Sequence, residues 1–352
     1  MLISIQYLRG IAAIMVVLFH TASAASGYTW LPSVLLSGAG GVDIFFVISG
    51  FIMWQSTART KIAPADFLRK RVARIAPIYW LMTLVMCATP IISGTLARGL
   101  VPDIGHTLAS FAFIPWHSSR DDPGIFFPVY TPGWTLNFEM FFYLVFAASL
   151  WIADWHWRFL ALITTFGLLV SIGCYAPKKS VAAWMLAPII LEFAGGICIG
   201  VWAETQSTLS APVAAATIVA GFVAMGATAE PGFVQMFRVI HWGIPAILIV
   251  LGAVELERNR RIPSWPLLLL SGDASYSLYL THLFVIGVIA IGWHVLHLWT
   301  STAGVAAFFM VTLVASQIIA IFVHRYIELP LSEAARKLLT RKNAASVAPA
   351  GP

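Results

Sequence analysis

Ten apolar runs of about 18 to 22 residues dominate this sequence. An α-helix of that length crosses the hydrocarbon core of a bilayer, so each run predicts one membrane-spanning helix. Hydrophobic residues make up 59% of the 352 residues and charged residues only 10%, and a water-soluble fold cannot cover so much apolar surface. We therefore expect an all-α, polytopic membrane protein. The predicted spans are residues 7–26, 38–56, 73–93, 133–152, 158–176, 183–203, 211–228, 237–254, 272–293 and 303–326.

The distribution of lysine and arginine predicts how these helices are oriented. An even number of spans puts both termini on one side, and sixteen of the 21 basic residues fall on that side. Because cytoplasmic loops collect positive charge, both termini are predicted to be cytoplasmic. The net charge of +6 then reports topology and does not indicate a nucleic-acid partner. Arg98, Arg120, Lys178, Lys179 and Arg238 fall on the outer side, and the adjacent Lys178 and Lys179 are the local exception.

One transmembrane domain is expected to account for nearly the whole chain. We assign it to residues 1–335 and expect residues 336–352, which are polar and rich in alanine and proline, to form a disordered cytoplasmic tail. The longest connection, about residues 94–132, faces outward and contains GHTLASFAFIPW, an apolar segment too short to span. It predicts a re-entrant or interfacial element, with a plain loop as the alternative.

A histidine and two carboxylates within the spans are candidates for chemistry, because an ionisable group at membrane depth costs about 2.5 to 3.5 kcal/mol. His20 lies about 20 Å from the cytoplasmic edge of the first span. Glu139 and Asp43 enter their spans from outside to a similar depth. A carboxylate near an imidazole raises its basicity, as a general base acting on a hydroxyl requires. The sequence predicts that His20 and Glu139 cooperate in this way, with Asp43 as a further catalytic candidate and structural pairing as the alternative.

Three arginines form a second group at the predicted cytoplasmic face. Arg71 and Arg74 stand at i, i+3 on one face of the helix that begins the third span, and Arg9 lies at the matching level of the first. Clustered guanidinium groups suit a ligand with several phosphates. Anchoring to anionic lipid headgroups is the alternative for the same residues.

The ninth span carries SYSLYLTH, in which Tyr276, Tyr279 and His282 recur at i, i+3 and i+6. Such a stripe can line a substrate channel or satisfy its own hydrogen bonds between helices, and we group Trp134 with it as a lining residue. The sequence has no H-E-x-x-H, G-x-S-x-G or C-x-x-C motif, so no metal is expected. The segment TASAASG after His20 contains a pattern typical of signal-peptide cleavage, but nine further spans make a cleavable leader unnecessary.

Six motifs follow one another along the chain. They are R-x10-H (Arg9 to His20), FFVISGF (residues 45–51), R-x-x-R followed by I-x-P (Arg71, Arg74, Pro77), W-x-L-x-x-E-x-x-F-Y (Trp134 to Tyr143), S-Y-x-x-Y-x-x-H (Ser275 to His282) and E-x-P (Glu328, Pro330). Together they resemble the acyltransferase-3 family, and within it the exopolysaccharide-production branch.

The resemblance implies a ten-helix enzyme of the bacterial inner membrane. Such an enzyme moves an acyl group, with acetyl as the expected group, from cytoplasmic acyl-CoA to a hydroxyl of a glycan or lipid-linked acceptor. The resemblance makes His20 the catalytic residue and associates Arg9, Arg71 and Arg74 with the acyl donor. His20 either activates the acceptor hydroxyl or is itself acylated. A transporter or flippase with His20 and Glu139 as a proton relay, and a non-catalytic partner of a polysaccharide synthesis complex, are the alternatives.

Overall fold

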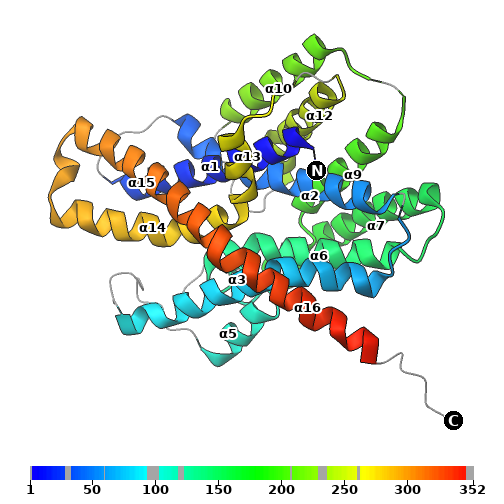
Figure 1. Cartoon of the computed structure of the whole chain (residues 1–352), viewed down its shortest axis with the longest axis horizontal. Coiled ribbons are helices and arrows are strands. Elements are labelled where there is room, and N and C mark those ends of the chain that lie inside the picture. Colours follow the sequence, from blue (N-terminus) through cyan, green and yellow to red (C-terminus); the bar gives the residue numbers. More distant parts are fainter. Residues whose placement is uncertain are drawn as a thin grey trace.

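The computed structural model describes residues 2–27, 33–58, 60–92, 103–117, 123–206, 208–228, 236–259 and 262–345. Every regular element within these ranges is helical, which confirms the predicted fold class. Helices α1 and α2 lie in the middle of the bundle, with α10 and α12 on one side and α3 and α6 on the other, while α14 and α15 extend to one end (Figure 1).

Each of the ten predicted spans overlaps a helix of at least 14 residues. Within the described ranges, eight helical stretches are long and apolar enough to cross a membrane, so the chain is a multi-pass membrane protein. The other two predicted spans, α6 and α10, have 16 residues each. The cytoplasmic orientation of the termini stays a prediction. The long helices are α1 (Ile3–Ala25), α2 (Gly41–Thr57), α3 (Pro64–Ile92), α6 (Trp134–Ser149), α7 (Trp155–Tyr175), α9 (Leu191–Glu204), α10 (Ala211–Gly226), α12 (Ile244–Arg258), α14 (Ser275–Val295) and α15 (Thr302–Val323).

Shorter elements connect or extend these helices. The 3-10 helices are η1 (Ser33–Gly40), η2 (Thr131–Gly133), η3 (Pro188–Ile190) and η5 (Leu298–Thr300), and the π-helices are η4 (Val239–Gly243) and η6 (His324–Glu328). The remaining α-helices are α5 (Ile104–Phe111), α8 (Val181–Met185), α11 (Met236–Arg238), α13 (Pro266–Asp273) and α16 (Leu329–Ala345).

Helix α5 forms part of the connection predicted over residues 94–132. Asp103 caps its start by accepting a hydrogen bond from the backbone N–H of His106 at 2.6 Å. Ile104 and Leu108 are exposed, while His106 and Ala109 are buried against the bundle. A short helix with one apolar exposed face is typical of an interfacial element. Residues 93–102 and 118–122 of this connection lie outside the described residues.

The predicted disordered tail is helical over its first part. Helix α16 continues to Ala345, so residues 336–345 correct that expectation, while residues 346–352 lie outside the described residues. The polar composition suggested disorder, but the helix gains an i, i+4 ion pair between Glu333 and Lys337 at 2.8 Å. It also packs against α3, which it crosses in Figure 1, and the Ser332 hydroxyl donates to the Arg74 carbonyl at 3.5 Å.

Small residues let α2 and α9 touch backbone to backbone. A Cβ atom added at Gly50 would lie 2.0 Å from the carbonyl oxygen of Phe193, and one added at Gly196 would lie 2.0 Å from the carbonyl oxygen of Val47. Helices in membranes associate through such close van der Waals contact, because lipid provides little hydrophobic driving force between them. The contact fixes the position of α2, which carries Asp43 and Ser49.

An aromatic core holds α6 against its neighbours. Phe142 of α6 stacks on Phe193 of α9 with ring centroids 4.3 Å apart, and Phe193 also contacts Phe46 of α2 at 4.6 Å. All three side chains are buried, whereas aliphatic side chains such as Leu168 and Ile318 are exposed on the outside of the bundle. An apolar exterior of this kind suits lipid, and the buried aromatic layer fixes the helix that carries Glu139.

Candidate active site

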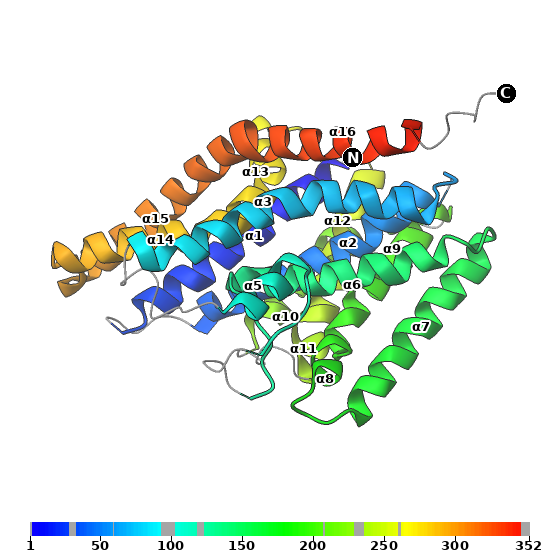
Figure 2. The same ribbon diagram turned by 90° about the horizontal axis from the view of Figure 1, so that it is seen from below.

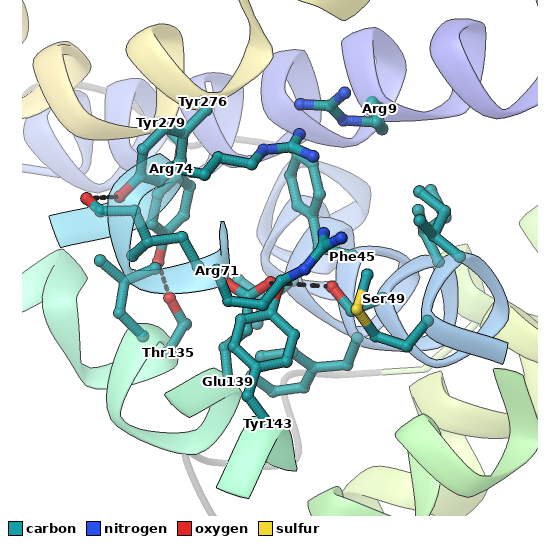
Figure 3. A pocket seen from close by; sticks show the side chains of 17 residues that line it. Arg9, Phe45, Ser49, Arg71, Arg74, Thr135, Glu139, Tyr143, Tyr276 and Tyr279 are labelled. Carbon is teal, nitrogen blue, oxygen red and sulfur yellow. Dashed lines mark hydrogen bonds between the residues drawn. The ribbon is translucent and has the colours of Figure 1, made fainter. Parts of the chain in front are cut away.

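A cavity lined by three arginines lies among α1, α2, α3, α6 and α14 (Figure 3). Arg9 enters it from α1, and Arg71 and Arg74 enter it from α3. The three arginines that the sequence associated with the acyl donor therefore converge on one space, which we call the arginine cavity. Its other polar lining residues are Ser49, Thr135, Glu139, Tyr143, Tyr276 and Tyr279.

Arg9 and Arg71 each contact a side chain of their own helix. The Arg9 guanidinium donates to the side-chain carbonyl of Gln6 at 3.0 Å, and Arg9 is only 8% exposed. Arg71 lies over the ring of Phe67, 5.4 Å from its centroid. Three cationic groups face one carboxylate, that of Glu139, among the described residues that line the cavity. The cavity is therefore positively charged and suits an anionic ligand.

Glu139 belongs to the arginine cavity and not to His20. Its Oε1 accepts hydrogen bonds from the hydroxyls of Ser49, at 3.0 Å, and of Tyr143. The predicted direct pair between Glu139 and His20 does not form, because the two residues line different cavities. Equal depth in the membrane does not determine which way a side chain points around its helix axis. Here α6 turns Glu139 toward α2 and α3, where its charge offsets part of the arginine charge.

His20 lies in a neighbouring cavity, which we call the histidine cavity. Residues from α1, α2, α14 and η2 line it, together with Trp134 and Arg238. The nearest described imidazole is that of His282, whose ring centroid is 5.0 Å from that of His20. Phe19 packs edge-on against His20 at 4.8 Å. His20 thus opens to a cavity on one side and contacts rings on the other.

Asp43 pairs with Arg238, an arginine that the sequence analysis counted on the outer side. The guanidinium of Arg238 donates to both carboxylate oxygens of Asp43, at 2.6 and 3.0 Å, and the exposed fractions of the two side chains are 3% and 0%. Both carboxylate oxygens of Asp43 thus bind Arg238, which favours the structural pairing that the sequence left as the alternative to a catalytic role. The fully buried Glu192 interacts electrostatically with both members of this pair.

Arg238 is the site residue that sequence reasoning missed. It was counted among the basic residues of the outer side, yet its side chain lies between the rings of Trp242, at 4.8 Å, and Trp134, at 5.9 Å. It also lines the histidine cavity. The sequence did contain a signal for this role: Arg238 stands at the edge of an apolar run, where a charged group needs a carboxylate partner. Asp43 and Glu192 are carboxylates within predicted spans and were the candidates for that partner.

The polar stripe of α14 divides between the cavities. Tyr276 lines the arginine cavity and donates to the carbonyl of Ile75 at 2.8 Å. Tyr279 lines both cavities and donates to the carbonyl of Pro132 at 3.0 Å. Trp134 lines the histidine cavity, as expected of a lining residue. His282 is fully buried and lines neither of them.

A third cavity continues from His20 toward the ends of α1, α3 and α14 opposite the arginines, and we call it the distal cavity. It shares His20, Thr131 and Leu283 with the histidine cavity, which in turn shares Val42 and Tyr279 with the arginine cavity. Along α1, Arg9 lies in the first cavity and His20 in the second and third. The three spaces therefore adjoin in a series that follows α1 through the bundle, along the direction in which α14 runs beside α1 and α3 (Figure 2).

The fold and the cavities define a multi-pass helical membrane protein in which a cationic space adjoins a buried histidine. Residues 2–321 match the family model for the acyltransferase domain of the acyltransferase-3 family. The chain belongs to this family and is an O-acyltransferase. This result confirms the resemblance of the six motifs and argues against the transporter alternative.

Curated relatives match most of the chain. The exopolysaccharide production protein ExoZ of Rhizobium meliloti (strain 1021) is 40% identical over 281 residues, which cover 78% of this chain and 82% of that protein. Nodulation protein 10 of Rhizobium leguminosarum bv. viciae is 28% identical and covers 77% and 78% of the two chains. The putative membrane-bound transacylase BcsY of Komagataeibacter xylinus is 27% identical and covers 79% and 71%. No solved structure matches the chain.

Proposed function

We propose that this enzyme transfers an acyl group, specifically acetyl, from cytoplasmic acyl-CoA to a hydroxyl of an exopolysaccharide or other cell-surface glycan, or of its lipid-linked precursor. It would work in the bacterial inner membrane with both termini in the cytoplasm. The observation that carries the proposal is the series of three adjoining cavities, with arginines at one end and His20 farther along α1.

The arginine cavity suits the donor. Coenzyme A has several phosphates at one end and a thioester at the end of a long, thin arm. Guanidinium groups form charge-assisted, often bidentate hydrogen bonds with phosphate oxygens, so Arg9, Arg71 and Arg74 would hold the nucleotide end. Arg9 and His20 are separated by eleven residues, or about 16 Å along a helix, which an extended arm can cover. The thioester would then pass Tyr279 and Val42, which the first two cavities share.

His20 would act as the general base. It takes the proton of the acceptor hydroxyl while that oxygen attacks the carbonyl carbon of the thioester. The C–S bond breaks, the proton passes from His20 to the departing sulfur, and the products are an ester and free coenzyme A. Glu139 would have a different role from the one we expected. It would balance the charge of the arginines, held in place by its hydrogen bonds from Ser49 and Tyr143, without touching the reacting atoms.

A variant of this chemistry would acylate His20 first and transfer the group in a second step. Incubation of the purified enzyme with radiolabelled acetyl-CoA and no acceptor separates the two routes. If the wild-type protein becomes labelled and the His20→Gln variant does not, the two-step route is established. Unlabelled wild-type protein that still transfers acetyl groups when acceptor is added would establish direct transfer.

The acceptor is proposed from the relatives and from the distal cavity. The name of ExoZ refers to exopolysaccharide production, and the chain covers 82% of that protein. The distal cavity reaches His20 from the end opposite the arginines, so donor and acceptor would approach the histidine from different sides. Hydroxyl and imidazole groups of Ser23, Thr89 and His294 line it and could bind sugar hydroxyls.

The decisive experiment measures binding and transfer together. Purified wild-type protein should bind acetyl-CoA, and membranes that contain it should move labelled acetyl groups to glycan. Chemical analysis of surface glycans from cells with and without the gene should show ester-linked acetyl groups only in the former. Failure of the pure, folded protein to bind acetyl-CoA, together with unchanged glycan acylation in the deletion strain, would overturn the proposal.

A further inference from the structure

His282 is a buried histidine that the proposed mechanism does not use. It lies on α14, three residues after Tyr279, and none of its surface is exposed. A histidine buried in a bundle normally has both ring nitrogens hydrogen-bonded, because an unmet polar group costs about 1 to 3 kcal/mol. In His282 only one nitrogen has a partner among the described residues.

The hydrogen bond of that nitrogen determines the tautomer of His282. Its Nδ1 lies 2.7 Å from the backbone carbonyl oxygen of Tyr279. A carbonyl oxygen only accepts, so Nδ1 must carry the hydrogen, and in the neutral ring Nε2 then carries a lone pair. The side chain of Tyr279 is itself anchored to Pro132 and Thr135, at 3.0 and 2.9 Å, which holds this part of α14 in place. Nε2 of His282 is therefore a fixed hydrogen-bond acceptor with no partner in the described part of the chain.

The ring beside this acceptor is His20. The two ring centroids are 5.0 Å apart, with an angle of 39° between the ring planes. At this separation, rotation of the His20 side chain can bring one of its ring nitrogens within hydrogen-bond distance of Nε2 of His282. His20 has room for that rotation because its other side faces the histidine cavity. Catalytic hydrogen bonds are often long in the resting enzyme and tighten once substrate is bound.

We infer that His282 positions His20 by accepting a hydrogen bond from one ring nitrogen of His20, so that the other nitrogen presents its lone pair to the cavity. This inference rests on the proposed function, in which His20 is the base. Neutral histidine carries its hydrogen on one nitrogen only, so a partner that accepts from one nitrogen leaves the other able to take a proton. When His20 takes the acceptor's proton, its bond to His282 is kept and stabilises the imidazolium. His282 touches no substrate and is a positioning residue.

Two substitutions of His282 test its two ring nitrogens one at a time. The amide of Asn in His282→Asn reproduces the position of Nδ1 and can still donate to the Tyr279 carbonyl, but nothing replaces Nε2. The longer Gln in His282→Gln places an amide near the position of Nε2, where its oxygen can accept from His20. We expect the Asn variant to lose about 10- to 100-fold in kcat, the loss typical of removing a partner that orients a functional imidazole. Its KM for acetyl-CoA should be unchanged, and the Gln variant should keep most of the activity.

The control is His156→Asn, because His156 is exposed at the start of α7 and lines none of the three cavities. It should match the wild type in kcat and KM. Two results would overturn the inference: an Asn variant of His282 with wild-type kcat, or a folded Gln variant whose kcat has fallen as far as that of His20→Ala. A failure of the proposed role of His20 as the base gives a different result, because His20→Ala would then keep wild-type acetyl transfer.

Discussion

The buried ion pair between Asp43 and Arg238 gives the sharpest structural prediction. Its two contacts measure 2.6 and 3.0 Å, and both side chains are almost completely shielded, at 0% and 3% exposure. Removing one partner of such a pair leaves a charge in a medium that cannot solvate it, at a cost of about 3 to 5 kcal/mol. Arg238→Gln should therefore lower the apparent melting temperature of the purified enzyme by about 5 °C or more.

Because of a neighbouring carboxylate, replacing Asp43 and replacing Arg238 should cost different amounts of stability. Glu192 is fully buried and interacts with both Asp43 and Arg238. In Asp43→Asn, Glu192 can become the counter-ion of Arg238, so part of the lost stability returns. In Arg238→Gln, two buried carboxylates remain without their cation. Asp43→Asn should thus destabilise less than Arg238→Gln, and the double variant Asp43→Asn, Arg238→Gln should be more stable than the Arg238 variant alone.

Thermal unfolding in one detergent, followed by tryptophan fluorescence, measures all three variants. The control is Glu333→Gln, which breaks an exposed i, i+4 pair with Lys337 and should leave the melting temperature unchanged. Equal melting temperatures for the wild type and Arg238→Gln would refute the reasoning. A double variant less stable than either single variant would also refute it. Removing both charges should leave neither member of the pair as an unpaired buried charge.

Three further predictions concern the donor site and the packing. Arg71→Gln should raise the KM for acetyl-CoA about tenfold or more, because a charge-assisted hydrogen bond is lost. Arg69→Gln is the control, since Arg69 lies on the same helix but is paired with Asp66 at 2.8 Å, and its KM should not change. Equal KM values for the two variants would contradict the donor assignment. Gly50→Ala should sharply reduce the yield of folded protein, since its Cβ would lie 2.0 Å from a backbone oxygen, and normal yield with wild-type melting would refute that contact. Glu257→Gln should weaken the start of α1, because Glu257 accepts from the N–H groups of Ile3 and Ser4 at 2.9 and 2.8 Å; hydrogen exchange at those amides should rise, and unchanged protection would count against the cap.

Much of the fold followed from the sequence because the strongest signal in it is local. A run of about 20 apolar residues has one stable solution in a bilayer, so the existence of each helix could be predicted without knowing its neighbours. The i, i+3 spacing of Arg71 and Arg74 is likewise local, and both residues do face one cavity. Arg9 joined them because its helix starts at the same end of the bundle as α3.

The predicted partners of the site residues were wrong where the direction of a side chain depends on rotation about its helix axis. His20 and Glu139 were paired by depth alone, but Glu139 points toward Ser49 and Tyr143, and the neighbour of His20 is His282. Asp43 was likewise placed near His20 by depth alone, but its partner is Arg238, 195 positions later. No sequence pattern links residues so far apart, so their contact becomes visible only in the folded structure.

The helical start of the predicted tail shows a different kind of error. Residues 336–345 are polar, and that composition outweighed their pattern in the prediction. Arginine, lysine, leucine and alanine are good helix formers, and α16 is stabilised by its contact with α3. Composition alone could not reveal that a polar helix would have a partner.

The central claim is that the acyl donor binds at the arginines while the chemistry takes place at His20. One measurement tests it most directly: acetyl-CoA binding and acetyl transfer by purified His20→Ala, each compared with the wild type. The account predicts wild-type affinity for acetyl-CoA, because the arginine cavity is intact, and a loss of transfer of about 100-fold or more, because the general base is gone. Undiminished transfer by His20→Ala would contradict it, and so would a variant that is folded but no longer binds acetyl-CoA.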